Sequence, residues 1–165
     1  MSCRIYMDHA ATTEMLPEVR EAMEPYLREE YGNASTSYEM GVRMHDAIEE
    51  AREKIAWVID AQPEEIFFTS GGSESDNWVI KSVAGEKKNS GKHLITTRIE
   101  HHAVLRSCQY LESLGYEVTY LDVDENGFID LDELQKAITP ETILISVMAA
   151  NNEIGTLEPL KEIGQ

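Results

Sequence analysis

The sequence predicts an α/β protein with a largely parallel sheet. Short apolar runs of strand length alternate with helix-length segments through its second half. A hydrophobic fraction of 42% over 165 residues is enough to form a core. No repeat, low-complexity tract or linker-like stretch marks an internal boundary, so we expect one continuous unit.

Two helices are expected before the alternation begins. In residues 16–31 the apolar positions recur at helical spacing, with Pro17 suited to a first turn and Gly32 to a stop. Pro25 is expected to kink or split this helix. A longer amphipathic helix is expected over residues 38–59, with one apolar face and charged residues elsewhere.

The alternation itself begins with a strand at Ile66–Phe68, followed by a glycine turn and a helix over 73–84. We then expect strands at 93–97, 116–121 and 142–148, with helices at 104–114 and 131–138. The start of another helix near Pro159 suggests that the chain is part of a longer one. Chemistry in parallel sheets lies at the carboxyl ends of strands, and three segments are candidates there: 70–77, 100–102 and 151–155.

The charge balance disfavours two classes of partner. The formal net charge of −17 repels phosphate backbones and anionic lipid, so neither nucleic acid nor a membrane is an expected partner. No apolar run approaches the roughly 20 residues of a membrane-spanning helix. Two cysteines and no apolar leader indicate a cytoplasmic protein without a disulfide framework.

The segment Ser70–Glu74 is a candidate anion site. It places small residues and a hydroxyl at the start of a helix, where free N–H groups and the helix dipole favour a phosphate. A sharp glycine turn with no ligand explains the same residues equally well. The segment matches neither the GxGxxG nor the GxxxxGK[ST] motif, so neither Rossmann nor P-loop chemistry is supported.

Two further segments place polar side chains beside the same crevice. His101 follows a predicted strand, although adjacent histidines point in different directions and no zinc motif is present, so no metal site is predicted there. The carboxamides of Asn151 and Asn152 follow another strand, where they could donate hydrogen bonds to a ligand or simply form a turn.

Residues 122–133 fit the calcium-loop pattern, with oxygen-bearing side chains at the ligand positions and Gly127 at the turn. An EF-hand needs a helix on each side, whereas residues 116–121 alternate as a strand does. A turn at Asn126-Gly127 and a helix cap at Asp130 explain the same residues. A calcium-responsive module therefore stays an alternative, and the turn and cap are favoured.

Five segments in order resemble the cysteine desulfurases of the NifS/IscS type, within the pyridoxal phosphate (PLP) dependent aminotransferases of class V. They match an opening D-x-A-A-T-T, then G-N-P-S-S, F-T-S-G-A-T-E-x-x-N, T-x-x-E-H-x-A-V-L and N-N-E-x-G. In this sequence they are residues 8–13, 32–36, 68–77, 97–105 and 151–155. The resemblance implies a truncated three-layer sandwich, with residues 1–15 covering the active site as part of the small domain and 16–165 forming an incomplete PLP-binding large domain.

The resemblance also implies site residues. Gly72 and Ser73 match the positions that hold the cofactor phosphate, with Ser73 in place of the usual threonine. His101 matches the histidine that stacks on the pyridine ring and moves protons, and Asn152 matches the asparagine that hydrogen-bonds the ring oxygen. The substrate carboxylate would lie near Ala11, Thr12 and Asn33.

The resemblance implies an N-terminal part of an enzyme that converts L-cysteine to alanine and an enzyme persulfide for iron–sulfur or thio-cofactor assembly. A homodimer and a sulfur-acceptor or scaffold protein are the implied partners. The Schiff-base lysine and the persulfide cysteine of the family have no counterpart here, so the isolated chain is expected to be inactive. A related PLP lyase or aminotransferase, or a PLP-holding module without catalysis, stays open.

Overall fold

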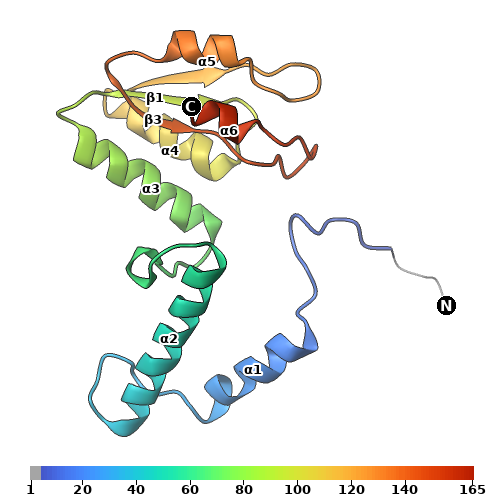
Figure 1. Cartoon of the computed structure of the whole chain (residues 1–165), viewed down its shortest axis with the longest axis vertical. Helices are drawn as coiled ribbons and strands as arrows, with labels where there is room; N and C mark the ends of the chain where they lie inside the picture. The colour runs from blue at the N-terminus through green and yellow to red at the C-terminus, as the bar shows by residue number, and fades with distance from the viewer. Residues whose placement is uncertain (1–4) are drawn as a thin grey trace. The chain divides into compact units, whose positions relative to one another are not determined.

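The computed structural model describes residues 5–165, which divide into two compact units, Met1–Phe68 and Thr69–Gln165 (Figure 1). No change of composition announces this division in the sequence. The boundary expected between residues 15 and 16 is a different one, and it stays a prediction.

The first unit is helical and buries few side chains. It contains α1 (Pro17–Arg28), α2 (Glu39–Val58) and the 3₁₀ turn η1 (Pro63–Glu65). α1 has no buried residue, and α2 buries only Gly41, Met44 and Ala56. Both helices were expected. Pro25, which was expected to kink or split the first, does not split it, because α1 runs through it. On a helix without a buried residue, water can satisfy the carbonyl that proline leaves unpaired.

The strand predicted at Ile66–Phe68 is not formed, and these residues are extended coil. Arg52 lies against this segment: its guanidinium donates a hydrogen bond to the Ile66 carbonyl and lies 5.0 Å from the centre of the Phe68 ring. An apolar run becomes a strand only where a neighbouring backbone offers a hydrogen-bonding ladder. The sheet of this protein lies in the second unit and does not include the segment.

The second unit is an α/β domain, as predicted. It contains α3 (Gly72–Lys87), β1 (His93–Thr97), α4 (His102–Ser113), β2 (Glu117–Leu121), α5 (Leu131–Ala137), β3 (Thr142–Ser146) and α6 (Leu160–Ile163). β1 is the central strand and pairs in parallel with both β2 and β3. The predicted strands and helices agree with these to within two or three residues at their ends.

The sheet separates two apolar clusters, which gives three layers (Figure 1). On one face Leu94 packs with residues of α3 and α4, among them Ile80 and Val104. On the other face Ile95 packs with Leu134 of α5 and with Ile163 of α6. Neighbouring residues of β1 thus enter opposite layers, as the two-residue period of a strand requires. The unit is therefore a small three-layer sandwich around a parallel sheet.

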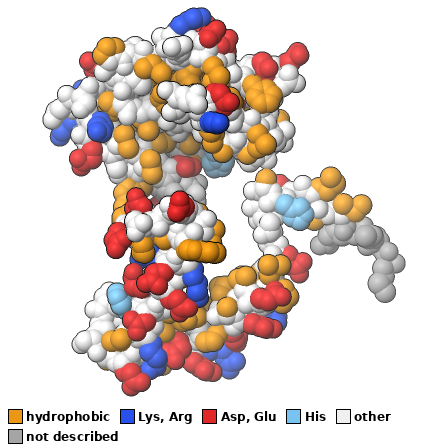
Figure 2. Space-filling model, viewed as in Figure 1, with side chains coloured by type: hydrophobic (Ala, Val, Ile, Leu, Met, Phe, Trp, Pro, Cys, Tyr) orange, Lys and Arg blue, Asp and Glu red, His pale blue; other side chains and the backbone are white. Residues whose placement is uncertain are grey.

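The surface carries charges of both signs among apolar side chains (Figure 2). Large apolar side chains stay exposed on both α1 and α2, for example Leu27, Trp57 and Val58. Within residues 5–165, no helix combines the length and the apolarity that crossing a bilayer takes.

Candidate functional site

A cavity of about 360 Å³ opens where β1 and β3 end. Its walls come from residues 98–101 after β1, from His102 and Leu105 of α4, and from residues 151–154 after β3. The sequence had placed chemistry at the carboxyl ends of these strands, and the structure brings His101 and Asn152 to one cavity. Arg98 also lines the cavity, and its Nε lies 2.6 Å from Asp122 Oδ1.

His101 is the N-cap of α4, and its side chain is exposed. Its Nδ1 accepts a hydrogen bond from the backbone N–H of Ala103 at 3.1 Å. An imidazole nitrogen that accepts must be unprotonated, so in the neutral ring the proton lies on Nε2. The cap thereby fixes the tautomer of the neutral ring and leaves Nε2–H as a hydrogen-bond donor toward a ligand.

The two adjacent asparagines have different surroundings. Asn152 is exposed and lines the cavity. Asn151 is buried, and its Oδ1 accepts hydrogen bonds from the backbone N–H groups of Glu153 at 2.9 Å and Ile154 at 3.0 Å. Asn151 thus closes the turn, and Asn152 is the carboxamide that a ligand could reach.

Glu100 is a buried carboxylate directly before His101, with 7% of its surface exposed. Its Oε1 accepts a hydrogen bond from the Met148 N–H at 2.6 Å. Burial is the main cause that raises the pKa of Glu100, and the nearby acids Asp76 and Glu158 raise it further.

Gly72 and Ser73 form the first turn of α3, and both are exposed. Open space surrounds the start of this helix: a Cβ added to Gly71 or Gly72 would meet no atom within 4 Å. Glu74 accepts a hydrogen bond from the Ser70 N–H at 2.6 Å and so holds the preceding turn. Backbone N–H groups in a first helical turn have no partner within the helix, which suits this end to an anion.

The predicted substrate residues Ala11, Thr12 and Asn33 lie in the first unit, apart in sequence from the cavity residues. Ala11 and Thr12 donate backbone hydrogen bonds to the Asp8 carbonyl at 3.1 and 3.2 Å. Asn33 folds its own loop, because its Oδ1 accepts from the Ser35 N–H at 2.9 Å. These contacts describe local turns, and the role of the three residues in substrate binding stays a prediction.

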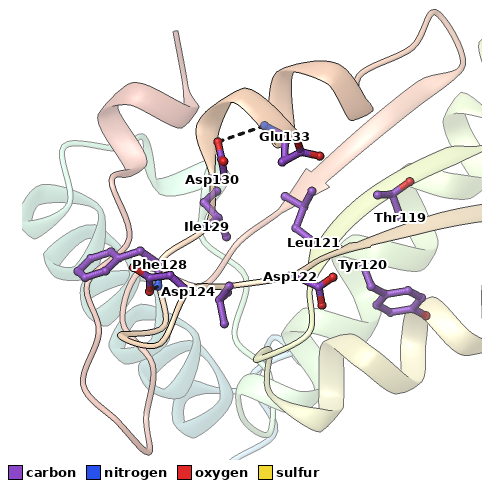
Figure 3. Close-up of a pocket in the computed structure, with 10 residues that line it drawn as sticks. Thr119, Tyr120, Leu121, Asp122, Asp124, Phe128, Ile129, Asp130 and Glu133 are labelled. Atoms are coloured by element: carbon purple, nitrogen blue, oxygen red, sulfur yellow. Dashed lines mark hydrogen bonds between the residues drawn. The ribbon is translucent and has the colours of Figure 1, made fainter.

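The predicted calcium loop lines a second cavity of about 700 Å³, beside β2 and α5 (Figure 3). Asp124 Oδ1 accepts from two backbone N–H groups of its own turn, those of Asn126 and Phe128 at 2.9 Å. Asp130 caps α5, and Glu133 pairs with Lys136 at 2.8 Å. Among residues 5–165, no three His, Cys, Asp or Glu side chains are grouped so that they could hold a metal ion. The loop therefore has the geometry of a turn and a helix cap.

Sequence reasoning missed the part that Asn151 and Glu100 play in joining the two loops. Asn151 Nδ2 donates to the Ile99 carbonyl at 3.0 Å, and Glu100 accepts from Met148. Side chains that carry a carboxylate or a carboxamide are usually exposed, and no local sequence pattern indicates that one beside a strand end is buried. The only sequence features that pointed to these contacts were the dipeptides Glu100-His101 and Asn151-Asn152.

Comparison with known proteins decides the family, because the model of the aminotransferase class-V family matches residues 5–165. The chain belongs to the aminotransferase class-V family. This class-V chain is 54% identical over 165 residues to a cysteine desulfurase IscS of Dictyoglomus turgidum, which covers 100% of the chain and 42% of the relative. It is 55% identical over 161 residues to a cysteine desulfurase IscS of Methanosarcina thermophila, over 98% of the chain and 40% of the relative.

Solved structures agree with this assignment. A NifS-like protein matches with a TM-score of 0.95 and 43% identity, over 98% of this chain and 44% of its own. SspA in complex with cysteine matches with a TM-score of 0.91 and 42% identity, over 96% of this chain and 46% of its own. The class-V chain thus spans less than half the length of the relatives that it matches.

Class-V aminotransferases depend in general on PLP, and the residues of this chain fit that cofactor. Open space and free N–H groups at the start of α3 suit a phosphate. A ring nitrogen of His101 and the carboxamide of Asn152 share one cavity, which suits a flat polar ring. The α3 start and the cavity belong to the same compact unit.

Proposed function

We propose that this chain is part of a PLP-dependent cysteine desulfurase and that the complete enzyme takes sulfur from L-cysteine, leaving alanine and an enzyme persulfide. The observation that carries the proposal is the meeting of His101 and Asn152 in one cavity at the ends of β1 and β3, in a class-V chain. Support comes from the names of the relatives, which are cysteine desulfurases, and from a similar structure titled as a complex with cysteine.

In this proposal each residue has a separate role. The backbone at Gly72 and Ser73 holds the phosphate, helped by the Ser73 hydroxyl. Asn152 would donate a hydrogen bond to the ring oxygen, and His101 would stack on the ring. When bound, PLP supplies an electron sink for charge that develops on an amino acid. His101 would also move protons: taking one up would protonate both ring nitrogens and release the Ala103 N–H from Nδ1.

The sulfur-carrying thiol must come from outside the described residues. Burial raises the pKa of Cys108 to about 11, so its thiolate is scarce at neutral pH. Cys108 is also 1% exposed and packs in the apolar layer under β1. Cys3 lies outside the described residues. Neither Cys3 nor Cys108 matches the persulfide cysteine of the family, and no lysine here matches its Schiff-base lysine, so we expect the isolated chain to release no sulfide.

The partners of the complete enzyme follow from the same proposal. We infer a homodimer and a sulfur-acceptor or scaffold protein, and we place the enzyme in the cytoplasm. The rival within the family is a related PLP lyase or aminotransferase. The alternative that is not an enzyme is a PLP- or calcium-binding module. Carboxylates within residues 122–133 already bind protein groups, which favours a PLP-binding module over a calcium-binding one.

Titration of the purified chain with PLP, followed by absorption and circular dichroism in the cofactor band, tests the proposal. Saturable induced dichroism that dialysis reverses is expected, with no sulfide on addition of L-cysteine. Ser73→Ala should weaken PLP binding by about 0.5–1.5 kcal/mol through one lost hydrogen bond. Ser82→Ala, an exposed serine farther along α3, is the matched control. Absence of induced dichroism, or equal affinity in Ser73→Ala, would sink the phosphate assignment.

A further inference from the structure

Two hydrogen bonds join the loops that form the cavity, and the loop after β3 donates both of them. Glu100, in the loop after β1, accepts from the Met148 N–H after β3 at 2.6 Å. Asn151, in the loop after β3, donates from Nδ2 to the Ile99 carbonyl after β1 at 3.0 Å. Each loop therefore contributes one side chain that binds the backbone of the other. We call these two bonds the loop clamp.

Both side chains of the loop clamp are buried, with 7% of Glu100 and 8% of Asn151 exposed. The orientation of the Asn151 carboxamide is fixed by its contacts, because Oδ1 accepts from two backbone N–H groups while Nδ2 donates to a carbonyl. Buried hydrogen bonds of this kind are costly to break, since either group would stay without a partner. The clamp is therefore a rigid link.

Each clamp residue directly precedes a residue that lines the cavity. Glu100 precedes His101, and Asn151 precedes Asn152. Since consecutive Cα atoms are joined by a planar peptide of fixed length, holding one residue in place restricts the position from which the next side chain starts. Hydrogen bonds thus join the two loops at the residues that directly precede the exposed side chains of His101 and Asn152.

We propose that Glu100 and Asn151 are positioning residues that set the separation of His101 and Asn152. What His101 and Asn152 would bind rests on the proposed function, but the loop clamp itself forms without a ligand. A carboxylate is a costly acceptor to bury, and two other acids, Asp76 and Glu158, act on Glu100. If Glu100 only stabilised its own loop, replacing it would change the conformation of that loop alone. As part of the loop clamp, its replacement should also change the conformation of the loop after β3.

Backbone amide NMR of the 165-residue chain without ligand tests the clamp. Glu100→Ala should move the amide signals of residues 151–154, and Asn151→Ala should move those of residues 98–102. Glu100→Gln retains an acceptor oxygen and should keep the wild-type signals of the opposite loop. Glu153→Ala, which removes an exposed carboxylate from the same cavity wall, is the matched control. Changes confined to the mutated loop would overturn the proposal.

A measurement on the unmodified chain keeps the test valid if an alanine variant does not fold. The Met148 amide lies beyond the end of β3, so only its bond to Glu100 should slow its hydrogen exchange. Exchange at the rate of an exposed amide would contradict the clamp.

Cofactor binding gives a readout that separates the two proposals. Glu100→Ala should weaken PLP binding by about tenfold, the change expected for one lost buried hydrogen bond, and Glu100→Gln should restore it. If the wild-type chain binds no PLP while the signals still move across the loops, the proposed function fails and the clamp stands. If PLP binds and Glu100→Ala binds it equally well, the clamp does not position the site.

Discussion

His93 and Thr142 join two strands of the sheet through a side-chain hydrogen bond, with 2.7 Å between His93 Nδ1 and Thr142 Oγ1. The other ring nitrogen, Nε2, lies 2.8 Å from Thr119 Oγ1 on the opposite neighbouring strand. One buried imidazole at the start of β1 thus links all three strands. These two side-chain hydrogen bonds add to the backbone hydrogen bonds between the strands, at the end of the sheet that is remote from the cavity.

Replacing His93 by alanine removes both contacts and leaves two threonine hydroxyls without this partner. We expect a loss of about 1–3 kcal/mol in the free energy of unfolding, measured by urea denaturation. His102→Ala changes an exposed histidine of the same unit and should stay close to wild type. Equal stability of the two variants would show that the imidazole does not tie the strands.

Gly91, just before β1, lies against the backbone of Glu141. An added Cβ there would collide with the Glu141 carbonyl oxygen, which also accepts the His93 N–H at 2.9 Å. Gly91→Ala should therefore destabilise the protein by about 1–3 kcal/mol.

The matched control for Gly91 is Gly85→Ala, in α3. No atom lies within 4 Å of a Cβ added at Gly85, and alanine is the better helix former. This variant should gain up to about 1 kcal/mol in unfolding free energy. A Gly91→Ala protein as stable as Gly85→Ala would mean that the turn before β1 can shift at no cost.

The pH dependence of stability should depend on Glu100. Burial raises the pKa of its carboxyl above the ordinary value of 4.5, so the folded state binds this proton more tightly than the unfolded state. The stability linked to that proton is complete below the unfolded pKa and is lost as the pH rises through the folded pKa. As the pH rises above the ordinary pKa of 4.5, wild type should therefore lose stability relative to Glu100→Gln.

The comparison with Glu100→Gln removes the effect of the large negative charge, which is nearly the same in both proteins. Carboxyls such as Asp124, whose pKa is lowered by backbone N–H donors, act in the opposite direction and at lower pH. Urea denaturation at several pH values measures the difference. Parallel stability curves for the two proteins would contradict a raised pKa at Glu100.

Asp130 should stabilise α5 as a cap and not as a calcium ligand. Its Oδ1 accepts from the N–H of Asp132 at 2.8 Å and from the N–H of Glu133 at 3.3 Å, the second of which is drawn in Figure 3. Asp130→Ala should cost about 1 kcal/mol of unfolding free energy, equally with and without calcium. A calcium-dependent rise in melting temperature that Glu133→Gln abolishes would instead support the calcium module.

The strands and helices of the second unit could be predicted because they depend on local patterns. Apolar runs predicted β1 to β3, and Asp130, whose side chain can cap a helix, predicted the start of α5. The prediction at Ile66–Phe68 was wrong, because a strand also needs a neighbour that the local pattern does not supply.

Only part of the candidate site could be predicted in the same way. Strand ends in a parallel sheet meet at one edge, so His101 and Asn152 could be expected at one cavity. Which of two adjacent asparagines turns inward depends on the tertiary partners of Asn151, namely the Ile99 carbonyl and its own turn. The link between the loops therefore became visible only in the structure.

The cavity between the loops after β1 and β3, together with the start of α3, is the proposed cofactor site. Amide NMR during titration with pyridoxamine 5′-phosphate is the sharpest test of this site, because this analogue lacks the aldehyde that reacts with surface lysines. Saturable shifts are expected at Gly72, Ser73, His101 and Asn152. Shifts confined to the larger cavity beside β2 and α5, or no saturable shifts, would contradict it.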